Sequence, residues 1–188
     1  MRRLFLAIHI KPTNNIDNLL ENLKNNLKYD LIKWVNSEQI HLTLKFFGNT
    51  SEENITPVIE TIRDALKKRA SFIINLRNIG IFGSRYNPKV IWLGISNSDE
   101  VKKIYSAISE SLKNINIYPD RQNFVSHFTL GRIKKINDKK HFQKIIDMHK
   151  NTEVGESFIT EVILFESVLN HEGAIHKPLH IFKLEIFI

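Results

Sequence analysis

Hydrophobic and polar positions recur along this chain with two different periods, and the periods predict its secondary structure. Apolar residues at i, i+3 and i+4 spacing, as in Ile16, Leu19 and Leu20, are typical of amphipathic helices. Short apolar or alternating runs, such as residues 4–10, are typical of strands. The helical pattern predicts four helices, over residues 14–29, 52–69, 98–114 and 138–149. The strand pattern predicts strands over residues 4–10, 32–35, 40–47, 72–79, 90–95, 128–133, 158–169 and 179–188, with a loop at 80–89.

Strands and helices interleave from one end of the chain to the other, and no Pro- or Ser-rich linker divides it. Interleaved elements that must bury their apolar faces against one another are typical of the α+β class. We therefore expect residues 1–188 to form one compact α+β domain. We also expect two similar lobes within it, from an internal duplication too diverged to remain a clean repeat.

The composition narrows the function classes. A chain of 188 residues without Cys is long enough for a substantial core, and it excludes disulfides, Cys-ligated zinc and thiol catalysis. Its formal net charge of +7 favours an anionic partner such as nucleic acid. No apolar run approaches 18 residues, and the first ten residues fit a strand better than a signal peptide. We therefore expect a cytoplasmic protein with no membrane partner.

Two segments have the same pattern, His-x-Thr-Leu, at residues 41–44 and 127–130. Side chains on a strand alternate between faces, so His41 and Thr43 would share one face of theirs, as would His127 and Thr129. The same alternation groups Lys45 with the first polar pair. It also places Phe46 with the apolar residues, so we expect Phe46 in the core.

Two histidines can cleave a phosphodiester without metal, one as general base and one as general acid, because imidazole titrates near neutral pH. The hydroxyls of Thr43 and Thr129 can donate hydrogen bonds to the phosphate oxygens. Arg132 is the best candidate for the cation, since guanidinium can bind two oxygens at once. Strict alternation would turn Arg132 away from this face, so it requires a bulge or a strand end near Gly131.

Two other readings remain open at this point. One is a non-catalytic RNA-binding module with a basic cleft, against which the paired motifs and Arg132 argue. The other is a metallohydrolase with His171, His176 and His180 as ligands. Pro178 lies between the last two of these histidines, and no acidic cluster completes a ligand shell, so we expect no metal and no other cofactor.

With these motifs in view, the chain resembles the two-histidine phosphoesterases, specifically the RNA 2′,3′-cyclic phosphodiesterases, also called 2′–5′ RNA ligases. The resemblance covers nearly the whole chain, and Ser126 and His176 depart from it at positions where Pro and Tyr are common. The segments that carry it are residues 3–8, Trp34 and Val35 with 41–48, 80–94, Phe124 with 127–132, and 164–174.

The resemblance implies a bilobal α+β fold, in which each lobe has an antiparallel sheet with flanking helices around a central cleft. It implies metal-independent hydrolysis of a terminal 2′,3′-cyclic phosphate on RNA to a 2′-phosphate, with a reverse 2′–5′ ligase reaction. By position, His41 would be the general acid and His127 the general base, while Thr43, Thr129 and Arg132 would hold the phosphate. The implied partners are RNA ends or small cyclic-phosphate nucleotides, with no obligatory protein partner.

Overall fold

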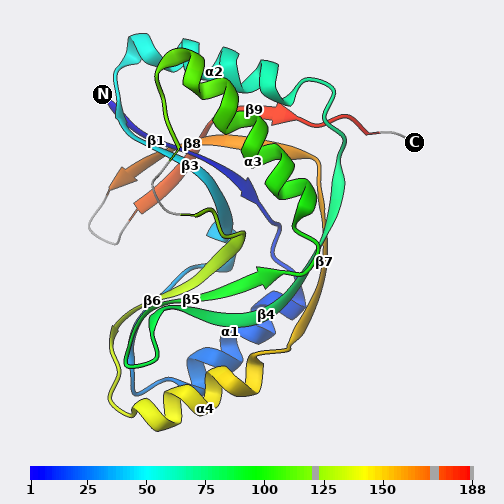
Figure 1. Ribbon diagram of the computed structural model, residues 1–188. Coiled ribbons are helices and arrows are strands. Elements are labelled where there is room, and N and C mark those ends of the chain that lie inside the picture. Colours follow the sequence, from blue (N-terminus) through cyan, green and yellow to red (C-terminus); the bar gives the residue numbers. More distant parts are fainter. Residues whose placement is uncertain (120–122, 170–173, 187–188) are drawn as a thin grey trace.

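The computed structural model describes residues 1–119, 123–169 and 174–186, and within these ranges the strands form two antiparallel sheets (Figure 1). The first sheet has the strand order β3-β1-β8-β9, and the second has the order β2-β6-β5-β4-β7. The strands of the first sheet are β3 His41–Thr50, β1 Arg2–His9, β8 Glu161–Leu169 and β9 Ala174–Lys183. Those of the second are β2 Leu31–Trp34, β6 His127–Lys135, β5 Asn87–Ile95, β4 Phe72–Ser84 and β7 Glu153–Ile159.

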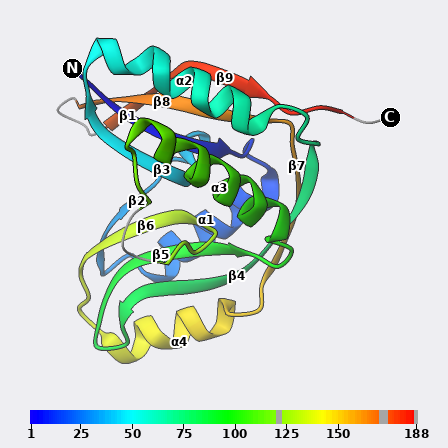
Figure 2. The same ribbon diagram turned by 45° about the horizontal axis from the view of Figure 1, so that its top comes forward.

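Helices cover the outer faces of both sheets, α2 and α3 over the first and α1 and α4 over the second (Figures 1 and 2). Each helix buries one apolar stripe, as its 3.6-residue period predicts. This arrangement confirms the predicted α+β class and its two lobes. The helices are α1 Asn14–Asn26, α2 Glu52–Leu66, α3 Asp99–Leu112 and α4 Lys139–His149, with short 3-10 segments at Ser37–Gln39 and Lys113–Ile115.

Three helices end earlier than predicted, α3 by two residues at Leu112. Helix α1 ends at Asn26 and α2 at Leu66, each three residues before the expected boundary. After α2, the backbone leaves the helical conformation at Lys67, whose ψ is 131°, and turns through Lys68 with a left-handed φ of 61°. The helix ends there although both residues are good helix formers.

The strand predictions were wrong in three places. The expected strand at 158–169 is two strands, since the chain crosses from β7 in the second sheet to β8 in the first at Thr160. Sequence reasoning missed most of β7 because only Val154 and Ile159 are buried on this polar edge strand. The expected loop at 80–89 is mostly strand, with only Arg85 and Tyr86 between β4 and β5. The closing strand was expected at 179–188, but β9 begins five residues earlier, at Ala174, and ends at Lys183.

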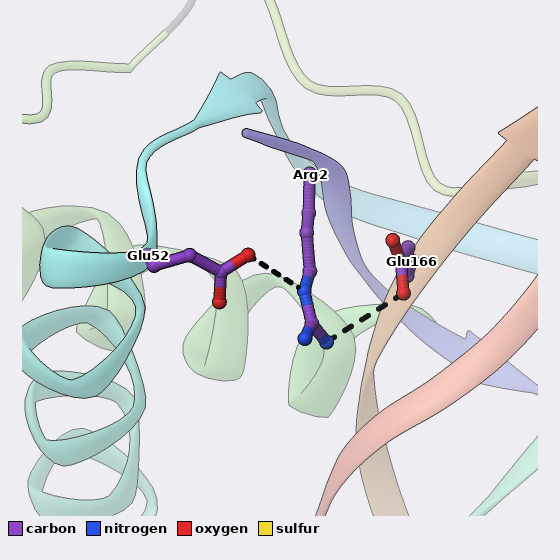
Figure 3. A network of polar contacts seen from close by, with 3 residues as sticks. All are labelled: Arg2, Glu52 and Glu166. Carbon is purple, nitrogen blue, oxygen red and sulfur yellow. Dashed lines mark hydrogen bonds and ion pairs between the residues drawn. The ribbon is translucent and has the colours of Figure 1, made fainter.

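The two lobes are not the two halves of the chain. The first sheet combines β1 and β3 with β8 and β9, so the ends of the chain meet in it. The polar contacts of Arg2 reinforce this meeting: its side chain lies 2.9 Å from Glu52 at the start of α2 and 3.7 Å from Glu166 on β8 (Figure 3).

The core consists of one large and one small apolar cluster. The large cluster includes side chains from both sheets and all four helices. The small one, made of Phe5, Ala7, Ile163 and Phe165, lies on the other face of the first sheet, next to His41. No helix in the described part of the chain is long and apolar enough to cross a membrane.

Candidate active site

The two His-x-Thr segments lie on β3 and β6, one in each sheet, and these strands approach each other between the sheets (Figure 1). In both segments the residue between His and Thr is buried against the helices: Leu42 is 1% exposed and Phe128 is 0% exposed. Because strand side chains alternate, the His and Thr of each segment point the opposite way, toward the space between the sheets.

Each motif histidine is held by the backbone carbonyl two residues before it. Nδ1 of His41 lies 2.7 Å from the Gln39 oxygen, and Nδ1 of His127 lies 2.7 Å from the Val125 oxygen. A carbonyl oxygen only accepts hydrogen bonds, so Nδ1 donates in both rings and Nε2 remains for proton exchange with a ligand.

Aromatic rings fix the two imidazoles from the side. His41 has Phe5 and His176 as neighbours, each with its ring centroid 5.0 Å away. His127 stands perpendicular to Phe82 at 4.6 Å. These contacts limit rotation of the rings and withdraw them from water.

A bulge in β6 brings Arg132 to the same side as the motif residues. The pairing with β5 shifts between Ile91, opposite Gly131, and Trp92, opposite Thr129, so that Leu130 is the extra residue. Leu130 and Gly131 are both buried and Arg132 is exposed, so the alternation of faces resets at this point. The predicted bulge near Gly131 is therefore confirmed.

A second bulge, in β3, overturns the expected faces of Lys45 and Phe46. The pairing with β1 shifts between Leu6 and Ala7, and Leu44 is the extra residue. Phe46, expected in the core, is 55% exposed. Lys45, expected beside Thr43, is buried, and its Nζ donates a 2.8 Å hydrogen bond to the carbonyl oxygen of Tyr118.

A cavity of about 450 Å³ between the sheets collects most of the predicted site. His41, Thr43, Thr129 and Arg132 all line it, together with Phe46. His127 does not line this cavity; it precedes Thr129 by two residues on the same face of β6, so it lies at the edge of the cavity.

The charge of the cavity lining is entirely positive. Arg3 and Lys33 join Arg132, and Lys33 is the register partner of Arg132 on the neighbouring strand β2. None of the described residues that line it is Asp or Glu. Cations with no carboxylate beside them favour an anionic ligand.

Burial controls the proton affinity of both motif histidines. Desolvation lowers the pKa of His41 from 6.5 to about 4, and the charges of His176, His9 and Arg132 act in the same direction, against the hydrogen bond to Gln39. Desolvation also lowers the pKa of His127, with a smaller contribution from Arg132. Both rings are therefore neutral at pH 7 in the free protein.

The histidines near the C-terminus do not assemble a metal site in the described part of the chain. His176 lies against His41 in the cavity, and His180 packs against Phe182. His171 lies outside the described residues. Across the described ranges, no group of three or more His, Asp or Glu side chains is arranged to hold a metal ion.

Comparison with known proteins identifies the family. A family model described as LigT-like phosphoesterase matches residues 10–92. An RNA 2′,3′-cyclic phosphodiesterase of Methanocaldococcus jannaschii is 32% identical over 175 residues, which cover 93% of this chain and 96% of that protein. This chain belongs to the RNA 2′,3′-cyclic phosphodiesterase family. The relative of the same name from Methanothermobacter thermautotrophicus is 28% identical, over 97% of this chain and 98% of its own length.

Solved structures support the same fold for this family member. TT0787 of Thermus thermophilus aligns over 97% of both chains with a TM-score of 0.78 at 21% identity. E. coli LigT, solved in complex with 3′-AMP, aligns over 97% of this chain and 98% of its own with a TM-score of 0.75 at 18% identity.

Sequence reasoning gave no place in the cavity to several side chains that line it, among them Lys33, Phe46 and His176. Lys33 gave no signal, because its position beside Arg132 depends on the pairing of β2 with β6. Phe46 was assigned to the core because the bulge in β3 depends on its partner strand. His176 was considered as a metal ligand and as a departure from the Tyr common in the family, but not as a neighbour of His41.

Proposed function

We propose that this protein hydrolyses the 2′,3′-cyclic phosphate at the 3′ end of RNA to a 2′-phosphate, without a metal ion. The observation that carries the proposal is a positively charged cavity next to the two motif histidines, and none of the described residues that line this cavity is Asp or Glu. Each of the two histidines donates a hydrogen bond from Nδ1 to the carbonyl oxygen two residues before it. The names of the relatives point to the same reaction.

The proposed reaction has one displacement at phosphorus. His127 accepts a proton from water through Nε2 while the water oxygen attacks phosphorus. The bond from phosphorus to the 3′ oxygen breaks as His41 donates a proton to that oxygen. The 2′ ester bond remains, so the product is a 2′-phosphomonoester and a free 3′ hydroxyl.

The remaining predicted residues would stabilise the charge that builds on the phosphate oxygens. The hydroxyls of Thr43 and Thr129 would donate one hydrogen bond each, and Arg132 would bind two oxygens. A bound phosphodiester anion would raise the pKa of His41, against the effect of its burial, and so favour the protonated form that a general acid needs.

The same displacement joins two RNA ends when a 5′ hydroxyl replaces water as the nucleophile. His127 would accept the proton of that hydroxyl as it attacks the cyclic phosphate, the bond to the 3′ oxygen would break with a proton from His41, and a 2′–5′ linkage would form. We include this ligase reaction in the proposal as the minor reaction in dilute RNA.

The decisive experiment uses an RNA oligonucleotide that ends in a 2′,3′-cyclic phosphate, with EDTA present. Wild-type protein should convert it to the 2′-phosphate, and His41→Ala and His127→Ala should each lose about 10²- to 10⁴-fold in kcat while keeping the circular dichroism of the folded protein. Binding of the RNA without any turnover by the folded wild type would instead support the RNA-binding module, and turnover only after metal addition would support the metallohydrolase.

A further inference from the structure

The net positive charge of this protein is concentrated in one region that starts at Arg132 in the cavity and extends beyond it. Residues 85–89 and 131–150 hold nine of the 27 Lys and Arg residues but only two of the 20 Asp and Glu residues. Their net charge therefore equals the +7 of the whole chain, and the rest of the sequence is neutral on balance. A uniformly solubilising surface would not concentrate its charge in this way.

This region extends beyond the cavity along β6. The β5–β6 ladder runs from Gly94 opposite His127 to Val90 opposite Arg132, and Lys134 follows Arg132 by two residues, with the buried Ile133 between them. Residues two apart on a strand are about 7 Å apart, so Lys134 is the next cation beyond Arg132 along β6.

Two further hollows continue the same path. Lys89, Lys134 and Lys139 line a hollow of about 250 Å³ at the end of the second sheet. Tyr86 and Lys139 line both this hollow and the next, which measures about 780 Å³ and lies between the β4–β5 turn and α4. Both ribbon views show that turn beside the start of α4 (Figures 1 and 2). We call the exposed lysines along this path the basic track: Lys89, Lys134, Lys135, Lys139, Lys140 and Lys144.

The lysines of the basic track are available to a ligand. None of them forms an ion pair with another described residue. The two acidic residues in the region have partners of their own. Asp138 accepts hydrogen bonds from the backbone at the start of α4, and Asp147, which lines the larger hollow, pairs with Arg85 of the same hollow at 3.5 Å.

An exposed aromatic ring lies within the basic track. Tyr86, at the tip of the β4–β5 turn, is 81% exposed and lines both outer hollows. Cations that follow a groove together with an exposed aromatic ring are the combination that binds single-stranded nucleic acid, by charge and by base stacking.

We propose that the basic track binds the backbone of the RNA strand on the 5′ side of its terminal cyclic phosphate, so that the enzyme prefers oligonucleotides to mononucleotides. The inference rests on the proposed function, because the cyclic phosphate is the last group of its strand and only the 5′ body can extend out of the cavity. It identifies the substrate as an RNA of several nucleotides, with Tyr86 stacking on one of its bases.

The test compares two variants that lose the same charge at different places. The track variant combines Lys134→Gln, Lys139→Gln, Lys140→Gln and Lys144→Gln. The control variant neutralises four exposed lysines away from the track: Lys11→Gln, Lys67→Gln, Lys68→Gln and Lys177→Gln. None of these eight residues belongs to the catalytic cavity.

Binding is measured first, by fluorescence anisotropy with a ten-nucleotide RNA that ends in a 3′ hydroxyl and does not react. The track variant should bind at least tenfold more weakly in low salt, and its log–log salt slope should be shallower by roughly 2–3, at about 0.7 for each lost phosphate contact. The control variant should stay within twofold of wild type. Equal weakening by both variants would overturn the proposal.

Turnover is then measured on a ten-nucleotide RNA with a 2′,3′-cyclic phosphate and on 2′,3′-cyclic AMP. The track variant should lose at least tenfold in kcat/KM on the oligonucleotide, through KM, and less than twofold on the mononucleotide. Equal losses on both substrates would overturn the proposal. Failure of wild type to turn over either substrate would count against the proposed function, and the binding result would still decide whether the track holds RNA.

The stacking contribution has its own matched pair. Tyr86→Ala should weaken oligonucleotide binding by at least about fivefold, since stacking on one base contributes roughly 1–3 kcal/mol. Tyr86→Phe keeps the ring and should bind within twofold of wild type. Unchanged binding by Tyr86→Ala would overturn the role of this ring.

Discussion

The two histidine motifs, one on β3 and one on β6, hold their imidazoles by the same kind of hydrogen bond but surround them differently. We call these two strands with their histidines the two arms of the cleft. Both imidazoles donate Nδ1–H to the carbonyl two residues earlier, at the same 2.7 Å. His41 is packed between Phe5 and His176, and burial lowers its pKa to about 4, whereas His127 has Phe82 beside it and lies at the edge of the cavity. The comparison separates two properties: the strand and its carbonyl fix how each ring points, and the packing around it fixes how readily it takes a proton.

The largest expected effect comes from replacing the two histidines. His41→Asn and His127→Asn should each lower kcat by about 10²- to 10⁴-fold. The kcat of the double variant should be only slightly lower than that of the less active single variant. Groups that act in one concerted proton transfer are not additive, because the loss of either removes the common step. Single-turnover rates on cyclic-phosphate RNA measure this. Additive losses would mean that the arms serve separate steps.

The pH dependence of the rate sharpens the difference between the arms. The general acid must be protonated and the general base neutral, and in the free enzyme both histidines have pKa values below 6.5. As pH rises above 6.5 the protonated acid becomes scarcer, so kcat/KM should fall by about tenfold per pH unit. The falling limb of kcat should lie at higher pH, because bound phosphate raises the pKa of His41.

A substitution beside His41 tests whether the pKa of His41 sets the falling limb of kcat/KM. His176→Phe keeps a ring against His41 and removes a charge that lowers its pKa, so the falling limb of kcat/KM should move to higher pH. Steady-state profiles from pH 4.5 to 9 measure both limbs. A kcat/KM that stays flat to pH 8.5 in wild type would show that burial does not control the acid.

The bulges on the two arms allow a smaller test. A Cβ on Gly131 would lie 2.8 Å from the side chain of Ile32 and 2.9 Å from the ring of Trp34, so Gly131→Ala must displace these two side chains of β2. We expect it to destabilise the fold by about 1–3 kcal/mol and to raise KM, because Arg132 follows directly. Gly48→Ala on β3 meets no atom within 4 Å and strains only a φ of +69°, so it should cost about 1 kcal/mol with KM unchanged.

Urea unfolding and steady-state kinetics measure both glycine variants. Equal destabilisation, with KM unchanged in each, would mean that β2 moves freely and that the bulge in β6 does not set the position of Arg132.

The sequence was sufficient for those features of the site that depend on one strand at a time. The faces of His41, Thr43, His127 and Thr129 follow from local alternation, and they agree with the burial of Leu42 and Phe128. The need for a bulge near Gly131 also followed from one strand. Strict alternation would turn Arg132 away from the face of His127 and Thr129, so only an irregularity could bring it there.

Features that depend on strand pairing were not predictable. The exchange of Lys45 and Phe46 arises from a bulge against β1, a strand that lies about 40 residues away in sequence. The position of Lys33 beside Arg132 depends on β2 joining the second sheet, and the crossing at Thr160 divides one apparent strand between both sheets. Register between distant strands is set by the packing of the whole molecule, which local periodicity does not report.

The smallest effect concerns the residue before His127. The Ser126 hydroxyl is buried and has no hydrogen-bond partner among the described residues, which is unfavourable in a folded protein. Ser126→Ala should therefore raise the free energy of unfolding by about 1 kcal/mol, a rise in Tm of roughly 2–4 °C for a chain of this size.

Ser126→Pro introduces the residue common in the family at this position. It should raise the free energy of unfolding slightly more than Ser126→Ala does, because proline restricts the unfolded chain. Both variants should keep kcat within twofold, because the Val125 carbonyl that orients His127 is retained. Thermal unfolding and kcat are measured on the same preparations. A large loss of kcat in Ser126→Ala, with Tm unchanged, would instead show that the hydroxyl takes part in the reaction. The two histidine motifs would then differ in chemistry as well as in burial.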